Sequence, residues 1–214
     1  MFRSILLAGA AAAAAPSFAA AAVIDFNNPA FTSSSYNYVY GPYKEDGFTL
    51  TASRCQASQG KQLCFVTPQG FKSIDTTGKA LITQLASTPI TITNDAGQAF
   101  KFTSIDVSEY WDDLTFGTGT MTAQFSFVFV DGSTATQNRT FNTRGRYPVT
   151  TLSFDLKPLK SFSFLPTTGT SGSLQIDNVR VAAVPEPASW AMMIGGFAFI
   201  GGALRRRSGA LAAA

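Results

Sequence analysis

The segment at residues 108–113 combines aromatic rings with carboxylates. Tyr110 and Trp111 are neighbours there, with Glu109 before them and Asp112 after them. Aromatic faces pack against the apolar faces of sugar rings, and carboxylates accept hydrogen bonds from sugar hydroxyls. These four residues are therefore predicted to contact a glycan. The alternative is that the aromatic side chains close the edge of a packed core.

A second aromatic set lies near the start of the domain and consists of Tyr36, Tyr38, Tyr40 and Tyr43. The first three tyrosines alternate with other residues, so on a strand they share one face of a sheet. Two interpretations stay open for this set. The tyrosines either bind a sugar chain or cover the surface of the sheet.

Catalysis is not favoured, because the 214-residue chain contains no histidine. This absence excludes histidine-based nucleophile systems and histidine zinc sites. A glycoside hydrolase needs only two carboxylates at a set separation, and Glu109 with Glu45 or Asp113 would supply such a pair. Any β domain rich in acidic residues offers pairs of this kind. The sequence therefore predicts a protein that is not an enzyme, with a glycan-active hydrolase as the alternative.

Cys55 and Cys64 are the two cysteines of the chain. In an exported protein, a pair at this spacing favours a disulfide that closes a short loop. A redox pair usually has two residues between its cysteines, and a metal site needs further ligands. A structural disulfide is the prediction.

The C-terminal segment has an order that suits a membrane. Pro185 and Pro187 flank Glu186 and hold it in extended backbone. Residues 188–204 carry no charge, and as a helix they would be about 25 Å long, near the lower limit for crossing a bilayer. Trp190 stands where an interfacial anchor is expected. The alternative, a buried helix of a soluble protein, does not explain the basic residues that follow.

Arg205, Arg206 and Arg207 follow this apolar stretch directly. Basic residues next to a span mark its cytoplasmic side, so the domain is predicted to lie outside the membrane. The whole tail resembles the PEP-CTERM sorting signal. In that resemblance Pro185–Pro187 match the recognition motif, Trp190 and Ala191 the start of the span, and the arginines its basic stop. The resemblance implies processing by an exosortase, a membrane protease of Gram-negative bacteria that make extracellular polysaccharide.

The N-terminal residues 1–22 are typical of a signal peptide. Arg3 precedes an apolar run of about a dozen residues, which is too short to span a bilayer, and a string of alanines follows. Cleavage after Ala20 and cleavage after Ala22 fit equally well. The chain is therefore expected to be exported to the cell envelope, the cell surface or the medium.

Residues 23–183 remain as the domain. Between Val23 and Val184 the chain has equal numbers of basic and acidic residues, so nothing in its charge points to nucleic acid. Period-two alternation with β-branched and aromatic residues recurs along it, for example from Met121 to Phe129. Turn signals such as Asp131-Gly132 separate these segments. The predicted fold is an all-β, antiparallel, jelly-roll-like sandwich.

The last predicted strand, residues 174–181, changes its alternation in the middle, and a β-bulge at Asp177-Asn178 would explain the change. Its Ile-Asp-Asn-Val sequence resembles the closing strand of carbohydrate-binding jelly rolls. The resemblance implies a structural Ca²⁺ between the first and last strands, with Asp25 and Asp177 as candidate ligands. In the alternative, both carboxylates accept backbone N–H groups or face solvent.

The predicted organisation is a signal peptide at 1–22, a β-sandwich at 23–183, a sorting signal at 184–207 with its membrane helix at 188–204, and a short cytoplasmic tail at 208–214. The expected partners are an exosortase, the membrane through the C-terminal helix, and extracellular polysaccharide, with no nucleic acid. Two alternatives to polysaccharide binding stay open: a secreted hydrolase, and a structural matrix protein without a ligand.

Overall fold

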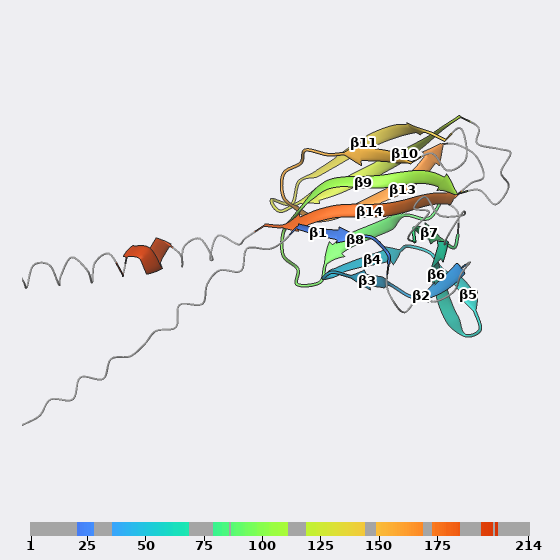
Figure 1. The fold of residues 1–214 in the computed structure, drawn as a ribbon, viewed down its shortest axis with the longest axis horizontal. Coiled ribbons are helices and arrows are strands. Elements are labelled where there is room, and N and C mark those ends of the chain that lie inside the picture. The colour runs from blue at the N-terminus through green and yellow to red at the C-terminus, as the bar shows by residue number, and fades with distance from the viewer. Residues whose placement is uncertain are drawn as a thin grey trace, which may run out of the picture. The chain divides into compact units, whose positions relative to one another are not determined.

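Two antiparallel layers of strands pack face to face in the computed structural model of the chain (Figure 1). The predicted all-β, antiparallel fold class is thereby confirmed. The structure describes residues 21–27, 36–68, 79–85, 87–110, 119–143, 149–168, 173–184, 194–198 and 200.

The strands are short in the first half of the domain and long in the second. In chain order they are β1 Ala21–Ile24, β2 Tyr36–Tyr40, β3 Tyr43–Glu45, β4 Phe48–Ala52, β5 Gln56–Ser58, β6 Lys61–Pro68, β7 Leu81–Thr83, β8 Ile90–Asn94, β9 Phe100–Tyr110, β10 Thr120–Phe129, β11 Thr134–Asn142, β12 Thr150–Ser153, β13 Leu159–Thr168 and β14 Ser173–Ala183.

One layer has the strand order β3-β4-β8-β13-β10-β11. The other has the order β2-β6-β7-β14-β9-β12, with β1 beside β14 and β5 beside β6. A single pair, Leu159 with Phe100, links β13 to β9 and joins the two layers along one side. Strand β2 therefore lies at one end of the second layer, and β9 and β14 lie in its middle.

Phenylalanines fill the space between the layers because they occupy alternate positions of facing strands. On β10 the buried residues Phe125 and Phe127 pair with Phe164 and Phe162 of β13. From the other layer, Phe102 stacks on Phe162 with 4.0 Å between the ring centroids. The alternation predicted from Met121 to Phe129 is confirmed in the burial pattern of β10.

The turn between β10 and β11 forms at Asp131-Gly132, as the sequence predicts. The Gly132 N–H donates to the Phe129 carbonyl at 3.0 Å, and Gly132 has φ of 83°, a conformation that glycine adopts without steric cost. The Asp131 carboxylate accepts the Ser133 N–H at 2.9 Å, which fixes the turn further.

Strand β14 contains the predicted bulge. Its pairing with β9 shifts between Asp177 and Arg180, so Asn178 and Val179 together stand opposite Ile105. Asn178 takes φ of 45°, in the left-handed region that Asn tolerates better than most residues. The prediction of a bulge at Asp177-Asn178 is confirmed. The extra residue at the bulge explains why the buried apolar positions are even-numbered before it (Leu174, Ile176) and odd-numbered after it (Val179, Val181).

Residues Ala20–Val184 form one compact unit. Strand β1 starts at Ala21, which pairs with Ala182 of β14. Of the tail, the structure describes helical backbone at residues 194–198 and 200, and the rest of the predicted helix 188–204 lies outside the described residues. No helix in the described part of the chain is long and apolar enough to cross a membrane.

Candidate functional site

The segment predicted to contact a glycan is described only in part. Glu109 lies near the end of β9, where its side chain is 5% exposed and the residue pairs with buried Leu174. Tyr110 is the last residue of β9. Trp111 and Asp112 lie outside the described residues. A glycan contact by this segment stays a prediction, and burial leaves Glu109 little surface for a ligand.

Glu109 points to the inner side of β9, as Ile105 and Val107 do, because these positions alternate along the strand. Burial raises the pKa of the Glu109 carboxyl, because a buried site disfavours its charged form. A carboxyl group inside the sandwich is therefore harder to ionise than one in water.

Glu45, the other described carboxylate of the proposed hydrolase pairs, is held by two donors. Its Oε2 atom accepts the Phe26 N–H and the Tyr43 O–H, each at 3.0 Å. Burial raises the pKa of Glu45, and these two hydrogen bonds partly oppose the shift. Burial and the adjacent Glu45 charge also raise the pKa of Tyr43. The arrangement ties the residues after β1 to strand β3.

The tyrosines near the start of the domain separate into two environments. Tyr43 is buried, with 3% of its surface exposed. Tyr38 and Tyr40 are 58% and 42% exposed, whereas Val39 between them is buried. Tyr36, Tyr38 and Tyr40 lie on one face of β2, and we call these three residues the tyrosine stripe. Alternate side chains on a strand are about 7 Å apart, so the stripe presents successive rings along one line.

Lys61 gives the tyrosine stripe a positive charge at one end. Its Nζ atom lies 5.4 Å from the centroid of the Tyr40 ring, within cation–π range. Lys61 begins β6, and the turn before it consists of Gln59 and Gly60, with φ of 49° and 75°. Two positive φ values are the signature of a tight hairpin turn that matches strand twist. The short β5–β6 hairpin thus positions the ammonium group beside the stripe.

The predicted disulfide is confirmed, and it closes this hairpin. Cys55 and Cys64 are bonded, with their Cα atoms 4.3 Å apart. They flank the pair Gln56–Leu63, and Leu63 also pairs with Tyr40 of β2. The disulfide therefore holds the β5–β6 hairpin at the Tyr40 end of the tyrosine stripe.

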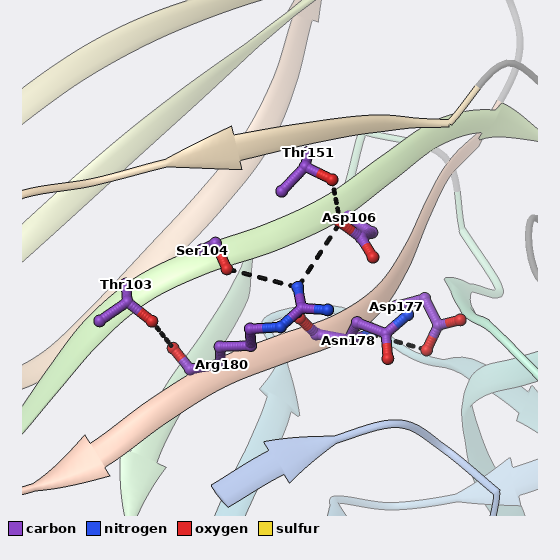
Figure 2. Close-up of polar contacts among 7 residues, drawn as sticks. All are labelled: Thr103, Ser104, Asp106, Thr151, Asp177, Asn178 and Arg180. Atoms are coloured by element: carbon purple, nitrogen blue, oxygen red, sulfur yellow. Dashed lines mark hydrogen bonds and ion pairs between the residues drawn. The ribbon is translucent and has the colours of Figure 1, made fainter. Parts of the chain in front are cut away.

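A polar network on the outer side of the β9–β14 pair was not anticipated from the sequence. Arg180 extends from β14 towards β9 and lies 3.8 Å from the Oδ1 atom of Asp106 (Figure 2). The same oxygen accepts the Thr151 hydroxyl at 2.6 Å, and Arg180 also donates to Ser104 at 3.4 Å. The sequence contained one sign of this network: Ser104 and Asp106 alternate with apolar residues, which places both polar side chains on the same face of β9. These contacts join three strands at the bulge.

The two candidate calcium ligands belong to neighbouring segments, since Asp25 directly follows β1, Asp177 lies on β14, and Ile24 of β1 pairs with Val179 of β14. Each carboxylate accepts a nearby backbone N–H: Asp25 Oδ1 from Asn27 at 3.0 Å, and Asp177 Oδ1 from Asn178 at 2.7 Å. These contacts agree with the alternative interpretation of the two residues. The described residues contain no group of three or more possible metal ligands, and the calcium site stays a prediction.

The sandwich extends to Val184, the residue before Pro185. The Val184 N–H donates to the Ala99 carbonyl at 2.9 Å, and Ala183 pairs with Phe100. The predicted sorting residues Pro185, Glu186 and Pro187, with Trp190, Ala191 and Arg205–Arg207, lie outside the described residues. Val184, which the sheet holds through Ala99, is therefore followed directly by the first proline of the motif.

Solved structures of carbohydrate-binding modules have distant similarity to the chain. A family 29 module variant complexed with mannohexaose is 14% identical, with a TM-score of 0.35, and the match covers 71% of this chain and 92% of that one. The family 32 module of NanJ from C. perfringens, in complex with galactose, is 14% identical, with a TM-score of 0.40 and coverage of 67% and 99%. No curated protein matches the chain.

The C-terminal segment gives a family match. The family model of the PEP-CTERM protein-sorting motif matches residues 183–207. This range includes every tail residue that the sequence singles out, from Pro185 to Arg207. It begins at Ala183, the last residue of β14, and leaves the rest of the sandwich outside the match. Residues 183–207 of this chain are a PEP-CTERM protein-sorting motif.

Proposed function

We propose that this protein is an exported, non-enzymatic protein of the cell surface or extracellular matrix, which an exosortase sorts and whose β-sandwich binds polysaccharide. The sorting motif at residues 183–207 is the observation that carries this proposal. Its two prolines favour an extended backbone around Glu186, its uncharged stretch suits a bilayer, and its arginines suit the cytoplasmic side. The tail thus holds the protein at the membrane while the protease acts.

Polysaccharide binding by the sandwich is supported by exposed aromatic surface. Tyr38 and Tyr40 stay exposed on β2, although the sandwich buries most of its phenylalanines. Tyrosine rings that stay exposed give up the free energy that their burial would contribute, and exposed apolar surface of this kind often marks a binding site. Each ring provides a flat apolar face with a polar hydroxyl at its tip. Sugar rings combine C–H faces with hydroxyl groups and therefore match this chemistry.

The alternative of a hydrolase has less support from the described residues. Glu45 is occupied by hydrogen bonds from Phe26 and Tyr43, and Glu109 is buried within the sandwich. Glu45 therefore has a structural role, and Glu109 has little exposed surface for a substrate. Release of reducing sugar by the purified protein, lost in a Glu109→Gln variant, would favour the hydrolase instead.

The sorting role is tested with two variants of the tail. Glu186→Gln removes the charge between the prolines, and deletion of Arg205–Arg207 removes the cytoplasmic stop. Both variants are expected to accumulate as unprocessed precursor in the membrane fraction, which immunoblotting and intact mass would show. Deletion of the three residues 208–210 is the matched control and should leave processing unchanged. Normal processing of both tail variants would contradict the proposal.

A further inference from the structure

We propose that the tyrosine stripe on β2 is the polysaccharide site of this protein and that its ligand is an acidic polysaccharide, whose sugars carry carboxylates. This inference rests on the proposed function, and it adds the site and the class of ligand. Three features carry it: the exposure of the rings, the position of Lys61, and the distribution of charge around β2.

The exposed rings provide the stacking surface. Tyr38 and Tyr40 are more than 40% exposed, and Val39 anchors the strand between them in the core. Strand β2 stands at the end of its layer, so a long polymer can lie along the strand beside the sheet. An extended polysaccharide presents sugar rings in succession, as the strand presents its alternate side chains.

Lys61 supplies the charge selectivity. Its ammonium group lies 5.4 Å from the Tyr40 ring centroid, and the side chain belongs to an exposed residue. Among the described residues, Lys61 forms no ion pair with a carboxylate. A sugar that stacks on the stripe would bring its own carboxylate close to this ammonium group. Ion pairing would then favour uronic acids over neutral sugars.

The surrounding strands share this positive character. In the layer that carries β2, the described residues 36–42, 53–68 and 79–85 contain Arg54, Lys61 and the buried Lys79 and no acidic residue. The first acidic residues after β2 are Glu45 at the end of β3 and Asp46 in the turn that follows, and β3 belongs to the other layer. The sandwich as a whole is neutral, so the end of the layer that carries the stripe has a local excess of basic residues. An anionic polymer is attracted there, and a neutral polymer is not.

The site is also rigid before any ligand binds. The Cys55–Cys64 disulfide closes the β5–β6 hairpin, and Leu63 in that hairpin pairs with Tyr40. Gln84 Nε2 donates to Gln56 Oε1 at 2.8 Å and links β5 to the segment after β7. A surface that is already ordered loses little conformational entropy on binding.

The test uses the exported protein purified from cells, with polygalacturonate as the acidic probe and galactomannan as the neutral probe. We expect polygalacturonate to bind at least tenfold more tightly, and added NaCl to weaken that binding because it screens exposed charges. Tyr38→Ala and Tyr40→Ala should each weaken binding of polygalacturonate about tenfold or more. Lys61→Gln should abolish the preference for the acidic probe.

The controls separate this inference from the proposed function. Val130→Ala removes exposed apolar surface on a distant turn, and Lys101→Gln removes an exposed charge on β9, so neither should change binding. Circular dichroism confirms folding of each variant. Equal binding of both probes, or binding unaffected by the tyrosine variants, overturns the inference and leaves the proposed function standing. Absence of binding to any polysaccharide contradicts both, and tighter binding of single-stranded DNA would also overturn the inference.

Discussion

Glu109 shows how the sandwich changes the chemistry of a single group. Burial raises its pKa above the ordinary value of 4.5, so the folded protein binds a proton at this site more tightly than the unfolded chain does. The stability that Glu109 contributes is fully present below about pH 4.5 and is lost as the pH rises through the raised pKa. Ionisation at neutral pH therefore costs stability.

A Glu109→Gln variant tests this linkage. The amide keeps the shape of the side chain and cannot ionise, so the variant should gain stability relative to the wild type as the pH rises above 4.5. Chemical denaturation at a series of pH values would measure the difference in the free energy of unfolding. The contribution of Glu45, whose pKa is also raised, cancels because both proteins contain it. A difference that does not change with pH would contradict the prediction.

At the scale of one residue, the tyrosines show that the surrounding strands, and not the residue type, determine how exposed a side chain is. Tyr38 and Tyr43 have the same side chain and lie five positions apart, yet one is 58% exposed and the other 3% exposed. Tyr43 packs 5.3 Å from the Phe26 ring and donates its hydroxyl to Glu45. The alternating pattern places Tyr36, Tyr38 and Tyr40 together on one face, but it does not say whether another element covers that face.

The β5–β6 hairpin is the element most dependent on a covalent bond. It has only three residue pairs, Gln56–Leu63, Ala57–Gln62 and Ser58–Lys61, and few of its residues are buried. Short hairpins are marginal in water without further support. The disulfide restricts the unfolded chain, and its closed loop is short.

Replacing both cysteines, Cys55→Ser with Cys64→Ser, should lower the free energy of unfolding by about 2–3 kcal/mol. Urea denaturation of the exported protein would measure this loss. The same double variant should weaken polysaccharide binding, because the hairpin positions Lys61 beside Tyr40. Unchanged stability would show that the bond does not constrain the hairpin. Unchanged binding would show that the site does not depend on the hairpin being held rigid.

The β9–β14 pair illustrates which element features are visible in the sequence. The interrupted alternation of residues 174–181 located the bulge. Apolar residues on both sides of the break can face the core only if one extra residue is inserted in the strand. The alternation pattern could not predict that Asp106 accepts a hydrogen bond from Thr151 or that Arg180 lies beside Asp106. Those contacts depend on which strand lies beside which, and Thr151 comes from a strand distant in sequence.

At the scale of the whole molecule, the two ends of the sandwich lie next to each other. Ala21 and Ala22 of β1 pair with Ala182 and Val181 of β14. The predicted signal peptide precedes β1 and the sorting motif begins at the end of β14, so the two segments are joined to neighbouring strands. The pairing also uses two residues that the sequence allowed to belong to the signal peptide.

The intact mass of the processed protein tests both ends together. We expect the mature chain to start at Ala21, because cleavage after Ala22 would remove two residues that pair in β1. We expect it to end at or beyond Pro185, because Val184 and Ala183 are bound into the sheet by Ala99 and Phe100. A protease needs an extended, accessible substrate. A mature chain that starts at Val23 or ends before Pro185 would contradict this prediction.

The sequence alone determined the features that depend on local order. Alternation of apolar residues specified the strands, the spacing of Cys55 and Cys64 specified the disulfide, and the order of prolines, apolar residues and arginines specified the sorting motif. Each of these is a relation between residues close together in the chain, so a single segment contains the whole signal.

The tertiary structure alone decided which side chains stay exposed and which distant residues meet. It buried Glu109, left Tyr38 and Tyr40 on the surface beside Lys61, and paired β1 with β14. Strand alternation defines two faces, whereas the packing of the layers selects the face that loses its water. That selection depends on pairings between segments far apart in sequence, and no local pattern contains them.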